Sequence, residues 1–166
     1  MNSKPASYWI NHLNLKPHPE GGFYKETYRS EGVLSHAHEA IVGGARNYST
    51  AIYFLLRGED KSNFHRIKSD EIWHFHAGDT LTVYVLSKDG LISYRLGDNL
   101  DAGDQLQVII PANHWFGAKL SEGSYTLAGC TVAPGFDFRD FELAASKDLL
   151  KEFPDEQEII ASLTLD

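Results

Sequence analysis

Three histidines and a glutamate lie close together in the segment FHRIKSDEIWHFHAGD, residues 64–79. Imidazole and carboxylate groups can transfer protons, and the same groups bind divalent metals. His65 and Glu71 form one candidate pair, and His74 and His76 form a second pair with the spacing of metal ligands. The segment therefore predicts a metal site, an acid–base site or a polar surface. The elements that carry these side chains decide between the three.

Strands and turns dominate the chain from about residue 22 to residue 133. In DTLTVYVLSKDGLISYRLGDN, Leu81, Val83 and Val85 share one face, and Lys88-Asp89-Gly90 supplies a hairpin turn. Many short strands separated by roughly 8–12 residues are typical of a sandwich or barrel. Near-helical spacing in PASYWINHLNL and in ASKDLLKEFPDEQEIIASL predicts short helices close to the two ends.

Composition narrows the function classes. The 166 residues fit one domain, the net charge is −8, and no block of lysines or arginines exists for nucleic acid to bind. We expect no membrane span and no secretory signal, because the chain has no long apolar run and no basic start followed by one. Cys130 is the single cysteine, which excludes an internal disulfide and favours a cytoplasmic protein.

Two motifs carry a resemblance to a known superfamily. The first has the order glycine, histidine, glutamate, glycine, and here it reads Gly58, His65-Arg66-Ile67, Glu71, Gly78. The second is echoed by Gly103 and by Pro111-Ala112-Asn113. Both resemble the cupin motifs, and the strings HPEGGFYKETYRS, DEIWHFHAGD and APGFDFRDFEL resemble the cupin-5 family (DUF985) in particular.

The resemblance implies an all-β fold, the double-stranded β-helix or jelly-roll barrel of RmlC-like proteins. It implies a single cupin domain over residues 1–166 with a barrel core at about 22–133, short N- and C-terminal helices, and a homodimer.

The resemblance also sets an expectation for metals. Metal-binding cupins use four ligands, but Ile67 and Phe116 stand here where two of the histidines belong. We therefore expect no cofactor, and no metal at the standard site. If a divalent metal is bound, its ligands would be His65, Glu71, His76 and His114. Strand alternation turns His74 and His76 away from an inward-facing Glu71, unless a bulge near Ala77-Gly78 turns His76 back.

A carboxylate inside a barrel is costly unless it is paired, and His65 is the nearest partner that the motif offers. We therefore predict His65 and Glu71 as catalytic residues, with His65 as general base and Glu71 orienting it. Alternation in GFYKETYRS places Tyr24, Glu26 and Tyr28 on one face. The remaining candidates for binding a ligand, which could instead serve packing, are Glu20, Tyr24, Arg29, Tyr53, Trp73, His114 and Trp115.

Three functions fit these residues. The first is a metal-independent sugar or nucleotide-sugar isomerase or epimerase, which the resemblance to RmlC-type epimerases favours. The second is a non-catalytic protein that binds a small polar molecule in its barrel. The third is a divergent metal-dependent cupin enzyme.

Overall fold

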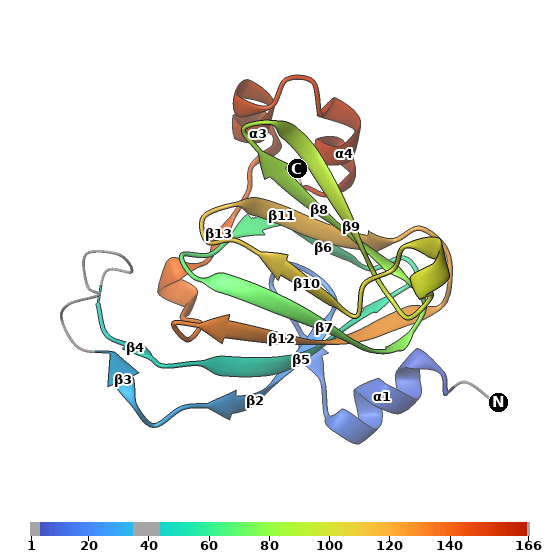
Figure 1. Ribbon diagram of the computed structural model, residues 1–166, viewed down its shortest axis with the longest axis vertical. Coiled ribbons are helices and arrows are strands. Elements are labelled where there is room, and N and C mark those ends of the chain that lie inside the picture. Colours follow the sequence, from blue (N-terminus) through green and yellow to red (C-terminus); the bar gives the residue numbers. More distant parts are fainter. Residues whose placement is uncertain (1–3, 35–43, 166) are drawn as a thin grey trace.

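The computed structural model describes residues 4–34 and 44–165, which form a β-barrel with short helices outside it (Figure 1). The helices are α1 (Ala6–Leu13), α3 (Ser146–Glu152) and α4 (Gln157–Ser162), with single 3-10 turns η2 (Leu100–Ala102) and η3 (Phe138–Asp140). The strands are β1 (Lys16–Pro17), β2 (Phe23–Arg29), β3 (Val33–Leu34), β4 (Arg46–Asn47), β5 (Thr50–Arg57), β6 (Lys61–Arg66), β7 (Asp70–Gly78), β8 (Leu81–Ser87), β9 (Gly90–Leu96), β10 (Gln107–Ile110), β11 (Trp115–Leu120), β12 (Tyr125–Ala133) and β13 (Glu142–Leu143).

Two antiparallel sheets face each other. The six-stranded sheet has the order β1-β2-β5-β12-β7-β10, and the five-stranded sheet has the order β13-β6-β11-β8-β9. Strands distant in sequence are neighbours in both sheets, as β5 and β12 are, which is the topology of a jelly roll. The predicted all-β fold with short terminal helices is confirmed.

The core lies between the two sheets, because alternate side chains of every strand point inward. Its largest fully buried members come from both sheets and include Phe54, Trp73, Leu81 and Phe116. The predicted face of Leu81, Val83 and Val85 belongs to this core, and Lys88 and Asp89 form the predicted turn between β8 and β9.

The helices cover apolar surface outside the barrel. Helix α1 packs Trp9 and Leu13 against the outer face of the six-stranded sheet, where Trp9 Nε1 donates to Tyr125 Oη at 2.9 Å. Helices α3 and α4 lie at the opposite end of the molecule and bury Leu149 and Ile160 (Figure 1). No helix in the described ranges is long and apolar enough to cross a membrane.

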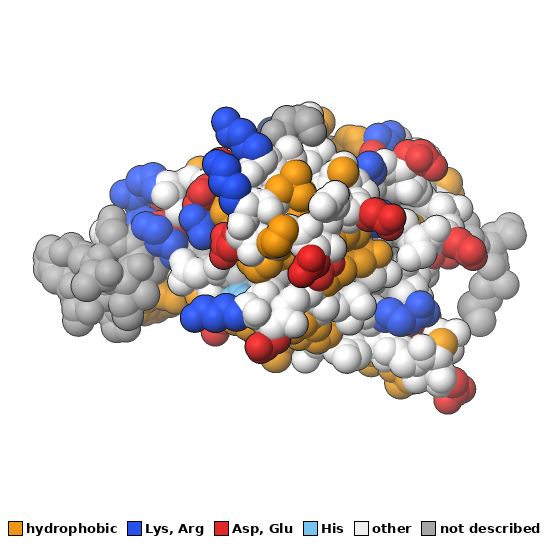
Figure 2. Space-filling model, turned by 90° about the horizontal axis from the view of Figure 1, so that it is seen from above, with side chains coloured by type: hydrophobic (Ala, Val, Ile, Leu, Met, Phe, Trp, Pro, Cys, Tyr) orange, Lys and Arg blue, Asp and Glu red, His pale blue; other side chains and the backbone are white. Residues whose placement is uncertain are grey.

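Charged side chains of both signs are interspersed on the face that Figure 2 shows, around a band of hydrophobic side chains.

Candidate functional site

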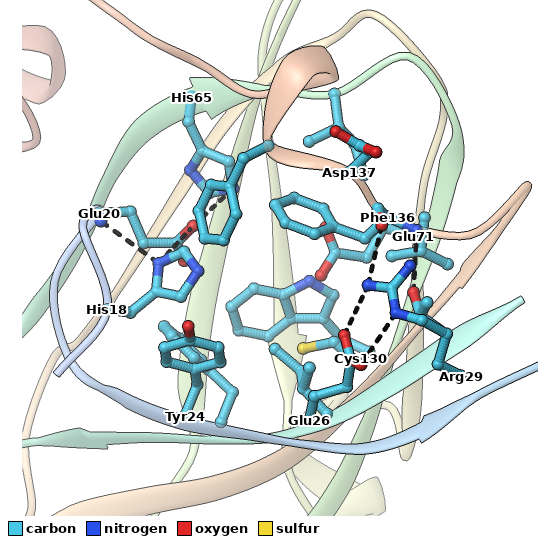
Figure 3. A pocket seen from close by; sticks show the side chains of 17 residues that line it. His18, Glu20, Tyr24, Glu26, Arg29, His65, Glu71, Cys130, Phe136 and Asp137 are labelled. Atoms are coloured by element: carbon cyan, nitrogen blue, oxygen red, sulfur yellow. Dashed lines mark hydrogen bonds and ion pairs between the residues drawn. The ribbon is translucent and has the colours of Figure 1, made fainter. Parts of the chain in front are cut away.

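A cavity of about 460 Å³ opens between the two sheets (Figure 3). Its walls come from the inner faces of β2, β5, β6, β7 and β12, from the loop before β2, and from the segment after β12. This size is typical of a site for a small molecule. Much of the wall is apolar, with Ile52, Phe54, Ile67 and Val132 among its residues.

Strand alternation decides which side chains of β5 reach the cavity. Thr50, Ile52 and Phe54 line it. Tyr53 points to the other face, where it packs beside α1 and its ring lies 5.8 Å from the ring of His76. Tyr53, which the sequence predicted as a ligand-binding residue, therefore does not line this cavity, because its position in the alternation turns it outward.

A bulge in β2 selects the charged residues at the cavity mouth. The pairing with β5 shifts between Glu26 and Tyr28, so that Arg29 lies opposite Thr50. Arg29 therefore lines the cavity, and Tyr28, which simple alternation placed inside, is 55% exposed. Tyr24 and Arg29 lie where the sequence predicted ligand-binding residues.

His65 is buried and pairs with Glu20, not with Glu71. Its Nε2 lies 3.1 Å from Glu20 Oε2, and its Nδ1 lies 2.8 Å from the carbonyl oxygen of Asn63. Ser62 Oγ donates to the other carboxyl oxygen of Glu20 at 2.7 Å. The expected His65–Glu71 pair is thus replaced by a pair between β6 and the loop before β2.

The carbonyl of Asn63 fixes one proton on His65 Nδ1, since a carbonyl can only accept. A single further proton must then occupy the contact between His65 Nε2 and Glu20 Oε2. Burial lowers the pKa of His65 to about 4 and raises the pKa of Glu20. Both shifts oppose separated charges, so the pair shares one proton and has no net charge.

His18 is a cavity residue that the sequence reading missed. The backbone N–H of Glu20 donates to His18 Nδ1 at 3.3 Å, which assigns the proton of the neutral ring to Nε2, and Glu20 Oε2 lies 3.4 Å from the same Nδ1. Burial lowers the pKa of His18, although the nearby Glu20 carboxyl opposes this shift. The ring stands edge-on to Tyr24, with centroids 4.5 Å apart, and its second nitrogen points into the cavity (Figure 3). The one signal in the sequence was the spacing His18-x-Glu20 within a turn.

Glu71 reaches the cavity from β7, as predicted. Burial raises its pKa to about 8, and the nearby Glu20 carboxyl adds to the rise. The thiol of Cys130 and the indole of Trp73 interact with the carboxyl and partly offset this shift. A carboxyl group in this range exchanges its proton near neutral pH, which is the property of a useful acid or base.

Trp73 lies beside Glu71 and is 1% exposed. Its Nε1 is close enough to affect the Glu71 carboxyl, but it lacks the geometry of a hydrogen bond to any described residue. A buried N–H without an acceptor costs about 1–3 kcal/mol. Trp73 therefore offers a donor to any ligand that enters the cavity.

Two ion pairs border the mouth. Arg29 donates from Nε and Nη2 to the Glu26 carboxylate at 2.9 and 2.7 Å, and from Nη1 to Asn47 Oδ1 at 2.8 Å. Asp137 accepts two bonds from the Arg139 guanidinium at 2.9 and 2.7 Å, which hold the pKa of that carboxyl well below its usual range.

Two further candidates lie outside the cavity. The Nδ1 of His114 faces the carbonyl of Ala112 at 3.1 Å, in the turn before β11. Trp115 packs with α3 and α4, and the guanidinium of Arg66 lies 4.3 Å from its ring centroid. Neither side chain lines the cavity, so the structure does not bring these two predicted ligand-binding residues together with the others. The next residue, Phe116, takes the inward position and fills the core.

The histidines of β7 point away from Glu71, as alternation predicted. His74 Nε2 lies 3.1 Å from Thr131 Oγ1 on the outer face of the sheet. A bulge does occur at His76, since Phe75 and Ala77 pair with consecutive residues of β12. The His76 ring nevertheless lies against Tyr53, outside the barrel.

The donor set does not fit a divalent metal. Ile67 lines the cavity and Phe116 fills the core, where two histidine ligands would stand, and neither side chain can donate to a metal. Both nitrogens of His65 face other groups. Across residues 4–34 and 44–165, no group of three or more His, Cys, Asp or Glu side chains is arranged to hold a metal.

Comparisons with known proteins place these features in a family. The sequence model of the family Cupin_5, described as cupin superfamily (DUF985), matches residues 7–144. The uncharacterized protein YML079W of Saccharomyces cerevisiae is 29% identical over 154 residues, which cover 86% of this chain and 76% of that protein.

Two solved structures are similar along nearly the whole chain. A hypothetical protein from Leishmania major has 33% identity and a TM-score of 0.90, covering 98% of this chain and 100% of that one. Protein SO0799 from Shewanella oneidensis has 39% identity and a TM-score of 0.88, covering 97% of this chain and 98% of that one.

Proposed function

The chain belongs to the Cupin_5 family of the cupin superfamily (DUF985), and from this premise we propose that its cavity binds a small polar carbonyl compound and moves a proton at the carbon beside the carbonyl. This is the chemistry of a sugar isomerase or epimerase, and it requires no metal or redox cofactor. One observation carries the proposal. His18 and Glu71 line the same cavity, and burial lowers the pKa of His18 while it raises the pKa of Glu71.

Glu71 is the general base. With a pKa of about 8, part of its population is ionised near neutral pH, and each ionised carboxylate is a stronger base than an exposed one. It takes the proton from the carbon next to the carbonyl, and the electron pair of that C–H bond moves to the carbonyl oxygen. The resulting enediolate regains the proton from Glu71 on the neighbouring carbon in an isomerase, while the hydroxyl proton of the first carbon passes to the former carbonyl oxygen. In an epimerase the same carbon instead takes a proton from water on the opposite face, and Glu71 releases its own proton to solvent.

His18 holds the oxygen that becomes negative in this step. Its lowered pKa keeps the ring neutral, and its Nε2–H can donate a hydrogen bond to a carbonyl oxygen. A neutral imidazole facing a carboxylate base is a known arrangement for enolisation, as in triosephosphate isomerase. The N–H of Trp73 supplies a second donor without a partner among the described residues.

His65 takes a positioning role in this proposal rather than the expected role of base, because both of its nitrogens already face Asn63 and Glu20. By holding the Glu20 side chain, it fixes the loop whose backbone N–H sets the tautomer of His18.

The proposal is tested by hydrogen exchange. The protein is incubated in D2O with dihydroxyacetone, D-xylulose and D-fructose, and NMR follows replacement of the C–H hydrogen beside the carbonyl. We expect exchange above the uncatalysed rate, reduced by about 100-fold or more in Glu71→Gln and in His18→Phe. His76→Asn is the matched control, because this histidine lies outside the barrel, and it should leave the rate unchanged.

A non-catalytic binding protein is the second candidate, and the apolar part of the wall favours it, because apolar side chains give affinity without chemistry. The same experiment separates the two functions. Binding of these compounds without exchange in the wild-type protein would reject the proton-transfer reaction and leave a binding protein.

A further inference from the structure

Resting on the proposed function, we infer that the ligand is a neutral, unphosphorylated hydroxy carbonyl compound of about monosaccharide size, and that the closed Arg29–Glu26 ion pair excludes phosphorylated sugars and nucleotide-sugars. The inference depends on which polar groups at the mouth and in the interior already have partners.

Arg29 is the only lysine or arginine among the described residues that line the cavity. Four of its five N–H groups are engaged, since it donates twice to Glu26, once to Asn47 and once, at 3.2 Å, to the carbonyl of Phe136. Arginine recognises a phosphate best through two parallel N–H groups that face the anion together. Arg29 has no such pair free while Glu26 holds it.

The other charges at the mouth also disfavour a phosphate. The carboxylate of Asp137 lines the cavity together with that of Glu26, so a phosphate at the mouth would lie beside two negative groups. The Arg139 guanidinium is held by Asp137 in a pair like that of Arg29 with Glu26. The net charge of −8 adds a long-range potential that repels anionic ligands.

The interior suits an uncharged ligand. The Nε1–H of Trp73 and the Nε2–H of His18 are donors, and they match a carbonyl oxygen and a hydroxyl group. The rings of Tyr24, Phe136 and Phe138 line the cavity and can pack against the C–H face of a sugar. Figure 3 shows Tyr24 and Phe136 near the cavity from different sides, with the Arg29–Glu26 pair beside them.

The test measures binding without turnover. Isothermal titration with D-fructose, D-fructose 6-phosphate and pyrophosphate compares the wild type with Glu26→Gln, which releases Arg29. We expect the wild type to bind fructose and to bind the two phosphate compounds at least about tenfold more weakly. Glu26→Gln should bind both phosphate compounds at least about tenfold more tightly than the wild type does, because charge-assisted bonds to Arg29 become available.

Asp60→Asn is the matched control. Asp60 holds Arg57 by the same bidentate geometry, at 2.8 and 2.9 Å, but neither residue lines the cavity. Releasing Arg57 should leave phosphate binding at the wild-type level. An equal gain in Asp60→Asn would mean that a freed arginine anywhere on the surface binds phosphate, and it would overturn the inference.

Two other results would also overturn the inference. One is wild-type binding of fructose 6-phosphate as tightly as fructose. The other is failure of dihydroxyacetone, D-xylulose and D-fructose all to bind. If these compounds bind and the phosphate compounds do not, but no hydrogen exchange occurs, the ligand class stands and the proposed reaction fails.

Discussion

His65 Nε2 lies 3.1 Å from Glu20 Oε2, so the histidine of the first cupin motif is held by a carboxylate from outside that motif. The loop before β2 supplies both Glu20 and His18, and thus one whole wall of the site. The site is therefore assembled from the barrel and from the segment that leads into it.

The Glu20–His65 contact predicts a contrast between two substitutions. If the pair shares one proton without net charge, Glu20→Gln keeps a donor toward His65 and an acceptor for Ser62, and it should cost less than about 1 kcal/mol of unfolding free energy. Glu20→Ala leaves both partners buried without a bond and should cost about 2–4 kcal/mol. Urea denaturation at pH 7 measures both values. Equal costs would show that the pair depends on a formal negative charge.

Local patterns predicted the fold and several side-chain directions. The motif spacing and the strand alternation placed Glu71 and Trp73 in the cavity and turned His74 outward, because a strand's period of two is a property of the strand itself. The replacement of a histidine by Ile67 was likewise visible in the sequence.

Contacts between distant segments could not be predicted in this way. Alternation gives a direction but no distance, so the partner of His65 had to come from the structure. The bulge that brings Arg29 to the mouth depends on how β2 pairs with β5, and no local signal marks it. Trp115 was misplaced for a similar reason, since the helices that cover it come from the C-terminal end of the described chain.

The raised pKa of Glu71 predicts how stability changes with pH. The folded protein keeps this proton up to about pH 8, whereas the unfolded chain releases it near 4.5, so the stability that the proton contributes is lost as pH rises between these values. His65 acts in the opposite direction, because its pKa is lowered from 6.5 to about 4 and its contribution is lost as pH falls through that range.

The two effects oppose each other below pH 6.5. From 6.5 upward the carboxyl groups with raised pKa values, Glu71 and Glu20, both lower the stability as pH rises. From Glu71 we expect the unfolding free energy to fall by about 2 kcal/mol between pH 6.5 and about 8. Urea denaturation at several pH values measures the fall. It should be smaller by this amount in Glu71→Gln and unchanged in Glu59→Gln, which changes an exposed carboxylate. If the unfolding free energy of Glu71→Gln fell as much as that of the wild type, other groups would be responsible for the fall.

The buried Arg46–Asp140 pair predicts a second stability difference. Arg46 Nε and Nη2 donate to Asp140 at 2.6 and 2.7 Å, and the two side chains are 2% and 4% exposed. Asp140→Asn removes the charge that compensates Arg46 and should cost about 3 kcal/mol. Asp137→Asn breaks a pair whose arginine is 64% exposed and should cost less than about 1 kcal/mol. Thermal and urea denaturation compare the two variants, and equal costs would contradict the difference.

The two tryptophans with unpartnered Nε1 atoms provide a matched test of the ligand-binding role. Within the described chain, the N–H groups of Trp73 and Trp115 are both buried without an acceptor, but Trp73 alone lines the cavity beside Glu71. Replacing either indole by phenylalanine removes an unsatisfied donor and leaves a smaller ring. We therefore expect both variants to fold, with stability losses of about 1–3 kcal/mol from the lost volume.

Ligand affinity should separate the two variants. Trp73→Phe removes an N–H donor that a bound ligand can accept, so affinity for a carbonyl compound such as D-fructose should fall by about three- to tenfold. Trp115→Phe should leave the affinity unchanged, because Trp115 packs between Arg66 and the C-terminal helices. Isothermal titration measures both affinities. Equal losses of affinity would mean that the effect spreads through the barrel. An unchanged affinity in Trp73→Phe would show that the indole does not contact the ligand.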